Sequence, residues 1–245
     1  KRWGETMVFS DIHIHALYGV DDGAETREEM LGIVGSAYRD GTRYMCLTPH
    51  YHPGYYGRNE ERTAKAFEQL SEYSAEHYPD LRLYLGNELH YMDGAVDWLH
   101  RGDCRTMNGT RYVLVDFSDH EPLNRIRLGL DRLLNGGYRP ILAHAERYAS
   151  IGGRLDEVRA MMQSGVLIQL DAQSLLGGFG LRIRMQSRKL LDAGLADIVS
   201  SDAHDMTSRP PAMSECHDFI EKRYGGAYAD ALCRSNAIQL LTDAE

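Results

Sequence analysis

Positive charge is in deficit in this sequence, and lysine is especially scarce. The 27 Lys and Arg residues face 36 Asp and Glu residues, which gives a formal net charge of −9. Broad binding to nucleic acid or to an anionic membrane surface depends on excess Lys and Arg, so both classes of partner are disfavoured. Nearly all the cations are arginines, which suit phosphate recognition. The lysines are Lys1, Lys65, Lys189 and Lys222.

Paired cysteines and long apolar runs are also missing. No Cys-x-x-Cys pair occurs, so the sequence indicates neither a thiol redox motif nor a compact zinc knuckle. No apolar run is long enough to span a bilayer, and no positively charged leader precedes an apolar stretch. We therefore expect reduced thiols, a cytoplasmic location and no direct membrane insertion. The oligomeric state is not indicated. The cysteines are Cys46, Cys104, Cys216 and Cys233.

Short apolar runs alternate with longer helical patterns, which is typical of parallel βα units. A chain of 245 residues fits one large domain or two small ones, and the regular alternation favours one barrel-like domain over residues 1–245. About seven runs are expected to form strands. They are Met7–His15, Arg43–His50, Leu81–Leu89, Tyr112–Phe117, Arg139–Ala145, Val166–Asp171 and Asp197–His204.

Helical patterns fill the segments between these runs. After the first run, Thr26 and Glu29 can form a capping box in front of an apolar stripe formed by Met30, Ile33, Val34 and Ala37. Further helices are expected at about Asn59–His77, Leu123–Leu134, Leu155–Gln163, Leu181–Leu191 and Ala212–Arg223. The Gly177–Gly180 stretch is interpreted as a mobile loop rather than as a phosphate cradle.

Histidines and carboxylates interrupt six of the seven runs at their carboxyl ends. Parallel barrels place their active sites at this face. A single histidine at a strand end is usually structural, but six such ends favour a cluster that binds divalent transition metals through imidazole and carboxylate. The residues are His13 and His15, His50, Glu88, Asp116, His144, and Asp202 with His204. None of the lysines ends a core strand, which disfavours a binuclear site bridged by a modified lysine.

The first run carries Asp11, His13 and His15 on the same side of a strand, so two imidazoles can converge on one metal. Asp11 is expected either to orient an imidazole ring or to belong to a buried polar network. The Asp21–Gly23 segment is by itself a common surface turn, and Asp22 becomes a metal ligand only in the company of the other ligands.

Arg147 follows His144 by three residues, and Arg209 follows His204 within a short loop. Alone, either arginine would be a solvated charge, but beside ligand-bearing strands the two are interpreted as a phosphate clamp. Other phosphoesterase and hydrolase signatures are absent: there is no Gly-x-Ser-x-Gly elbow, no P-loop and no Cys followed five residues later by Arg.

Several polar and aromatic residues near the expected ligands keep two interpretations. His52 is expected at a loop surface, with metal or substrate contact as the alternative, and His90 at the surface or supporting a ligand. Tyr51, Tyr55 and Tyr56 are expected either to line a substrate opening or to pack against the fold.

The motifs Asp11-Ile-His13-Ile-His15, Thr48-Pro49-His50, His144 with Arg147, and Asp202-Ala-His204 resemble the polymerase and histidinol phosphatase (PHP) superfamily over nearly the whole chain. Within it, the Asp21–Gly23, Gly86–Glu88, Ala143–Arg147 and Arg209–Pro211 segments look most like the bacterial tyrosine-protein phosphatases of capsular and exopolysaccharide operons.

This resemblance implies a distorted (β/α)7 TIM-like barrel of the PHP type that holds three metal ions, most often manganese, with iron, magnesium or zinc as alternatives. It implies one metal held by His13, His15, Glu88 and Asp202, a second by Glu88, Asp116 and His144, and a third by Asp22, His50 and His204. Arg147 and Arg209 would contact phosphate. The family usually has Glu where this chain has Asp116, which puts occupancy of the second metal position in question.

The expected function is a metal-dependent protein-tyrosine phosphatase, in which a pair of metals activates water for attack on phosphorus. Its implied substrate is the phosphotyrosine tail of an autophosphorylating bacterial tyrosine kinase that controls capsular or exopolysaccharide synthesis. The alternatives are a small-molecule phosphoesterase of the histidinol phosphatase type and a regulator that binds metal without turnover.

Overall fold

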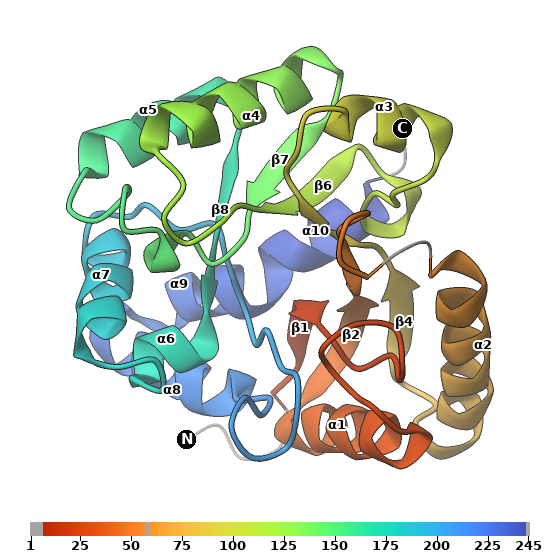
Figure 1. Cartoon of the computed structure of the whole chain (residues 1–245). Helices are drawn as coiled ribbons and strands as arrows, with labels where there is room; N and C mark the ends of the chain where they lie inside the picture. The colour runs from red at the N-terminus through yellow and green to blue at the C-terminus, as the bar shows by residue number, and fades with distance from the viewer. Residues whose placement is uncertain (1–6, 57–58, 244–245) are drawn as a thin grey trace.

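The computed structural model describes residues 7–56 and 59–243, and its strands form a parallel barrel surrounded by helices (Figure 1). Residues 1–6, named above as part of the expected single domain, lie outside the described residues. The strands are β1 (Phe9–Ile14), β2 (Thr42–Leu47), β3 (His50–Tyr51), β4 (Arg82–Leu85), β5 (Glu88–His90), β6 (Tyr112–Asp116), β7 (Arg139–Leu142), β8 (Leu167–Asp171) and β9 (Ile198–Ser200).

Helices follow most of the strands. The longer ones are α1 (Arg27–Asp40), α2 (Glu60–His77), α4 (Leu123–Asn135), α5 (Leu155–Ser164), α7 (Leu181–Asp192) and α8 (Met213–Tyr224). The last five agree with the expected ranges to within one residue, and α1 begins directly after its expected cap, Thr26. The shorter elements, which were not expected, are α3 (Ala95–Arg101), η1 (Met107–Gly109), η2 (Ala145–Arg147), α6 (Ala172–Leu176), α9 (Gly226–Asp230), η3 (Ala231–Ser235) and α10 (Asn236–Thr242).

The barrel has seven strand positions, as expected, and all paired strands run parallel. β1, β2 and β4 form one sheet, and β3, β5, β6, β7, β8 and β9 form the other. The two sheets meet because β3 continues the path of β2 and β5 continues that of β4. The barrel closes where Ile14 bridges Ala203 in parallel, and the amide of Asp202 donates to the carbonyl of His13 at 2.8 Å.

Two barrel strands are each broken at the same level. The expectation of one continuous strand over 43–50 and another over 81–89 was wrong, because Thr48-Pro49 separates β2 from β3 and Gly86-Asn87 separates β4 from β5. Proline has no N–H for the ladder. Hydrogen bonds still join the breaks, since the amide of Glu88 donates to the carbonyl of Pro49 at 3.2 Å. The break sets His50 directly opposite Glu88 in the β3–β5 register.

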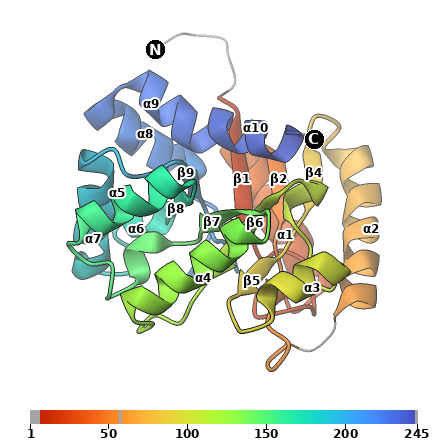
Figure 2. The ribbon, with the colours of Figure 1, turned by 90° about the horizontal axis from the view of Figure 1, so that it is seen from above.

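Apolar residues fill the barrel at the amino ends of the strands, whereas polar residues lie at the carboxyl ends. One buried cluster joins Ile12, Leu114 and Ile198 of the strands to residues of α10, among them Leu240. The hydroxyl of Ser10, near the start of β1, donates to the carbonyl of Arg234 at 2.9 Å. The C-terminal helices therefore cover the amino ends of the strands, as seen from above in Figure 2.

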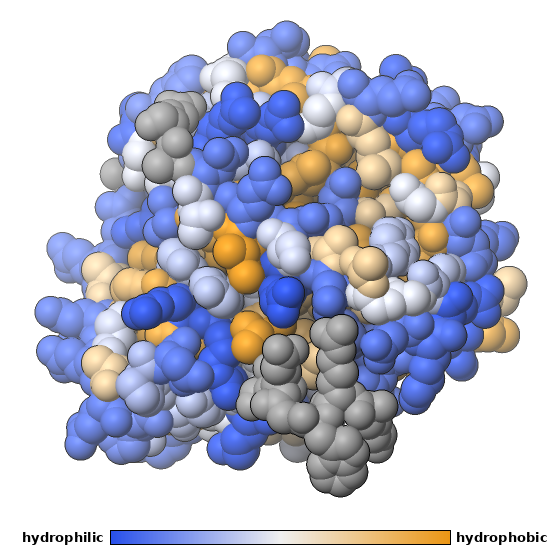
Figure 3. Space-filling view, turned by 180° about the vertical axis from the view of Figure 1, so that it is seen from behind, coloured by the Kyte–Doolittle hydropathy of each residue, from blue (hydrophilic) through white to orange (hydrophobic). Residues whose placement is uncertain are grey.

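Figure 3 shows the face opposite to that of Figure 1, where hydrophilic residues predominate and apolar residues occur in scattered patches.

Both ends of helix α1 are set by the local sequence. Thr26 and Glu29 form the expected capping box, and Gly41 ends the helix in the left-handed region with φ 110°. Within the described ranges, no helix combines the length and the apolar character that crossing a membrane requires.

Candidate metal centre

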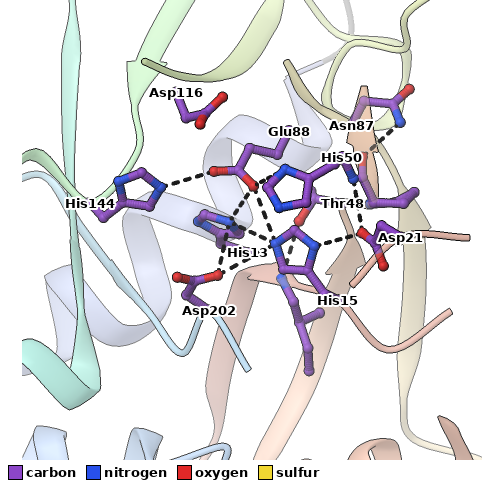
Figure 4. A network of polar contacts seen from close by, with 12 residues as sticks. His13, His15, Asp21, Thr48, His50, Asn87, Glu88, Asp116, His144 and Asp202 are labelled. Carbon is purple, nitrogen blue, oxygen red and sulfur yellow. Dashed lines mark hydrogen bonds and ion pairs between the residues drawn. The ribbon is translucent and has the colours of Figure 1, made fainter. Parts of the chain in front are cut away.

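The first donor group lies where β1 meets the end of β9. Strand alternation turns His13 and His15 to the same side, and their Nε2 atoms lie 3.1 Å apart (Figure 4). Both nitrogens face the same two carboxylates, with His13 Nε2 at 3.2 Å from Glu88 Oε2 and 3.3 Å from Asp202 Oδ1. All four side chains are buried. Two imidazoles and two carboxylates thus converge on one point.

Glu88 links this group to a second one. Its Oε2 faces His13 and His15, while its Oε1 lies 3.0 Å from His144 Nε2. Glu88, Asp116 and His144 each offer one ligand atom within 4.8 Å of the others. The carboxylate of Asp116 is also held from outside, because His90 Nδ1 lies 3.1 Å from each of its two oxygens. His90 therefore supports an expected ligand, one of the two roles foreseen for it.

The third group forms at the mouth of the barrel. His50 Nε2 and His204 Nε2 lie 3.3 Å and 3.5 Å from Asp22 Oδ1. His15 also has a ligand atom within 4.8 Å of this group, a contribution that the sequence did not suggest. All nine expected metal ligands therefore lie in three adjoining groups among the described residues: His13, His15, Asp22, His50, Glu88, Asp116, His144, Asp202 and His204.

Opposite charges hold this buried cluster together. Burial would raise the pKa values of Glu88 and Asp202, but the positive charges around each carboxyl, that of His13 foremost, lower both values well below their usual range. Burial would lower the pKa of His50, but the charge of Glu88 together with hydrogen bonds to Asp22 and Glu88 raises the value to about 10. Burial and the charge of Arg147 would lower the pKa of His144, but the bond to Glu88 and the charges of Glu88 and Asp171 together raise it to about 9.

Asp21 and Gln169 orient the first histidines, and sequence reasoning missed both. Asp21 Oδ2 lies 2.7 Å from His15 Nδ1, and it accepts a hydrogen bond from the amide of His50 at 2.9 Å. Gln169 Oε1 lies 3.2 Å from His13 Nδ1. Holding the outer ring nitrogen fixes which nitrogen faces the cluster. A polar Gln inside the apolar run of β8 was the available signal for this role.

Asp11 belongs to a buried network rather than to the cluster. Its carboxylate accepts hydrogen bonds from the hydroxyl and the amide of Ser201 and from the amide of His13. None of these bonds reaches an imidazole ring. Of the two roles expected for Asp11, the structure supports the buried network, which joins β1 to the segment after β9.

Arg147 and Arg209 lie beside the first group and share one acceptor. Nη2 of each donates to Asp202 Oδ2, with Arg147 at 2.7 Å. Arg147 Nη2 also lies 2.6 Å from Asp171 Oδ2. The Nε atoms of both arginines are buried without a hydrogen-bond partner among the described residues. Each arginine thus keeps one buried N–H donor without an acceptor among the described residues.

The loop that presents Arg209 is fixed by one carboxylate. Asp205 Oδ1 accepts hydrogen bonds from the amides of Thr207 and Ser208, both at 2.6 Å, and from the amide of Arg209 at 3.3 Å. The carbonyl of Arg209 in turn accepts from the amide of His204 at 3.0 Å. The arginine and the ligand at the strand end are therefore parts of one closed turn.

The remaining expected residues divide between packing and the opening. Tyr51 packs against Trp98, with ring centroids 5.7 Å apart, whereas Tyr56 stacks on His50 at 5.3 Å. Tyr55 is 80% exposed. His52 stacks on the ring of His90 and belongs to none of the three donor groups.

Nearly the whole chain matches a known family of proteins. A family model described as capsular polysaccharide synthesis, CpsB/CapC, matches residues 9–242. The chain belongs to this family. One relative of this CpsB/CapC member is tyrosine-protein phosphatase CpsB of Streptococcus pneumoniae. It is 33% identical over 238 residues, which are 95% of this chain and 98% of the relative. Tyrosine-protein phosphatase YwqE of Bacillus subtilis (strain 168) is 30% identical over 216 residues, 88% and 85% of the two chains.

Solved structures share the fold of this chain. A crystal structure described as one of YwqE from Bacillus subtilis and CpsB from Streptococcus pneumoniae, unique metal-dependent tyrosine phosphatases, superposes on this CpsB/CapC chain with a TM-score of 0.86 at 29% identity. It covers 98% of this chain and 96% of that one. Histidinol phosphate phosphatase of Lactococcus lactis, complexed with zinc, L-histidinol and phosphate, has a TM-score of 0.57 at 13% identity over 95% and 98% of the chains. The expected family and PHP-type barrel are confirmed.

Proposed function

We propose that this CpsB/CapC family member is a metal-dependent protein-tyrosine phosphatase. One observation carries the proposal: three groups of His, Asp and Glu donors adjoin two arginines whose buried Nε atoms have no partner among the described residues. Such a site offers ligands for divalent ions and donors for phosphoryl oxygens. Its named relatives, the phosphatases CpsB and YwqE, support the choice of phosphotyrosine as substrate.

The donor atoms fit divalent or transition metal ions. Glu88 Oε2 is buried without a hydrogen-bond partner in the described structure, although three imidazoles surround it. A buried carboxylate oxygen facing several imidazole nitrogens is suited to a cation. We assign one ion to His13, His15, Glu88 and Asp202, a second to Glu88, Asp116 and His144, and a third to Asp22, His50 and His204.

Ions held by these residues would supply an activated water nucleophile and would neutralise phosphoryl oxygens. Arg147 and Arg209 contribute by donating from their free edges to the phosphate, since charge neutralisation is the main requirement of phosphoryl transfer. Asp202 and Asp171 hold the guanidinium groups in place for this contact. A phenolate leaving group, whose parent pKa is about 10, needs less protonation than an alkoxide.

The finer parts of the proposal concern ions, partner and location. We propose three ions with manganese as the principal metal, and a tyrosine kinase of capsular or exopolysaccharide synthesis as the substrate. A cytoplasmic location and a single domain over residues 1–245 belong to the same proposal. Metal analysis of the purified protein tests the number and identity of the ions, and cell fractionation tests the location.

The decisive experiment compares two substrates on one preparation. Hydrolysis of a phosphotyrosine peptide and of histidinol phosphate is measured after metal removal and again after reloading with manganese. We expect turnover of the peptide only in the reloaded sample. A preference for histidinol phosphate would transfer the chain to the small-molecule phosphoesterases, and metal-dependent stability without any turnover would make it a binding regulator.

A further inference from the structure

The ring of Phe179 covers both arginines of the centre. Its centroid lies 4.3 Å from Arg147 Cζ and 5.9 Å from Arg209 Cζ. The two guanidinium groups come from different strand ends and donate to the same oxygen of Asp202. One partly buried aromatic ring therefore faces two like charges that approach each other closely. A ring face attracts a guanidinium through its quadrupole.

The turn that carries Phe179 is shaped for this contact. Gly177 and Gly180 have φ values of 105° and 86°, which side chains other than glycine rarely adopt. A Cβ at Gly178 would meet Gln173 Oε1 at 2.6 Å. The amides of Gly177 and Gly178 donate to the carbonyl of Gln173 at 2.9 Å and 2.8 Å. Gly177–Gly180 is thus a hydrogen-bonded turn between α6 and α7 that presents one ring.

The ring also determines which part of each guanidinium meets a ligand. A guanidinium donates hydrogen bonds from its edges, in its own plane, and none from its face. Arg147 Cζ lies over the face of the Phe179 ring. The Nη2 atoms of both arginines contact Asp202, and that of Arg147 also contacts Asp171. The Nε atoms of both arginines have no hydrogen-bond partner among the described residues. These N–H groups are the donors that we expect an anion in the centre to engage.

We propose that Phe179 is a positioning residue that fixes Arg147 and Arg209 so that their free edges receive a phosphoryl group. The inference rests on the proposed function of the arginine pair. In this role Phe179 acts through the two arginines. Its removal would let the guanidinium groups rotate and would admit water to their faces, while the nine metal-ligand residues would keep their places.

The test uses inorganic phosphate as a probe of the full-length, metal-loaded protein. Phosphate affinity is measured by calorimetry for the wild type, Phe179→Leu, Phe179→Tyr and the control Leu181→Ala, and metal content is measured for each. Leu181 is 70% exposed and lies next to the same turn. We expect F179L to bind phosphate about 5- to 30-fold more weakly, the loss expected for a desolvated cation–π contact. F179Y and L181A should remain within about twofold of the wild type, the precision needed to resolve that cation–π loss.

The outcomes separate this inference from the proposed function. Unchanged phosphate affinity in F179L, equal losses in F179L and F179Y, or lost metal in F179L would each overturn the positioning role. Hydrolysis of no phosphoester by the wild type, with the F179L loss still present, would reject the function and keep the role of Phe179. Should F179L prove unstable, Phe179→Met carries the same test, since it keeps an apolar side chain without a ring face.

Discussion

Asp21 offers a sharp test of how the centre is held, because one buried carboxylate supports two of the three donor groups. It lies 2.7 Å from His15 Nδ1 and accepts hydrogen bonds from the amides of His50 at 2.9 Å and Gly23 at 3.1 Å. Asp21→Asn keeps the shape of the side chain. Its new NH2 group must, however, face an N–H donor, either the amide of Gly23 or the amide of His50. The variant also removes the negative charge that holds the His15 ring.

Two independent estimates give the expected loss of metal affinity in D21N. A hydrogen bond to a charged group contributes about 1.5–3 kcal/mol, which corresponds to roughly a 10- to 150-fold change in an equilibrium. Groups that orient metal ligands typically change metal affinity or activity by about 10- to 100-fold. We therefore expect D21N to lose about 10- to 100-fold in metal affinity, with kcat/KM falling alongside it.

The measurement is a competition titration against a chromogenic chelator, with manganese and zinc in turn. Asp131→Asn on the exposed surface of α4 makes the same chemical change away from any donor group, and it should bind metal like the wild type. D21N with wild-type metal affinity would refute the orienting role. An equal loss in D21N and D131N would trace the effect to net charge instead.

Other consequences of the structure can be measured directly. His144→Ala should nearly abolish hydrolysis while the folded state persists, as circular dichroism and steady-state kinetics would reveal, and an unchanged rate would contradict the second ion. Arg209→Ala should raise the KM for a phosphotyrosine peptide or lower kcat, and no change in either would remove it from the clamp. Because the pKa values of His50 and His144 are raised to about 10 and 9 without metal, binding of metal at pH 7 must release protons. Affinity should therefore grow with pH, and calorimetry in buffers of different ionisation enthalpy would count the protons. Burial raises the pKa of Asp11 to about 6 despite bonds from Ser201, so the ionisation of Asp11 alone should cost the metal-free protein about 3 kcal/mol of stability as pH rises from about 4 through 6. Asp11→Asn should remove this loss, and urea unfolding at both ends of that range would test it.

Most of the metal-ligand residues could be predicted from the sequence because strand ends follow a simple geometric rule. Every expected ligand except Asp22 lies at the end of a short apolar run, and parallel strands bring their carboxyl ends to one edge. The rule also applied to Asp171, at the end of β8, which was not counted and which holds Arg147. That omission concerned a residue whose signal was present.

Contacts between distant segments were harder to foresee. Asp21 sits in what looks like an ordinary surface turn, and only the folded path brings its carboxylate under His15. The sequence indicates a mobile loop at Gly177–Gly180. It does not indicate that Phe179 contacts Arg147, because a cation–π contact leaves no spacing pattern in the sequence. The breaks in the second and third strands were missed for a related reason: Pro49 marks the end of β2, but local sequence does not indicate that pairing resumes at His50.

The seam of the barrel also sets when the centre can form during synthesis. His15 donates its amide hydrogen bond to Ala203, and the amide of Asp202 donates to His13, so the first ligands are joined to residues almost 190 positions later. At translation rates of about 5–20 residues per second, the nascent chain waits on the order of ten to forty seconds for that partner. During this interval His13 and His15 lack Asp202 and His204, and the ribosome-bound protein should hold metal weakly. Metal capture is therefore expected to be a late event, after the last strand has left the ribosome.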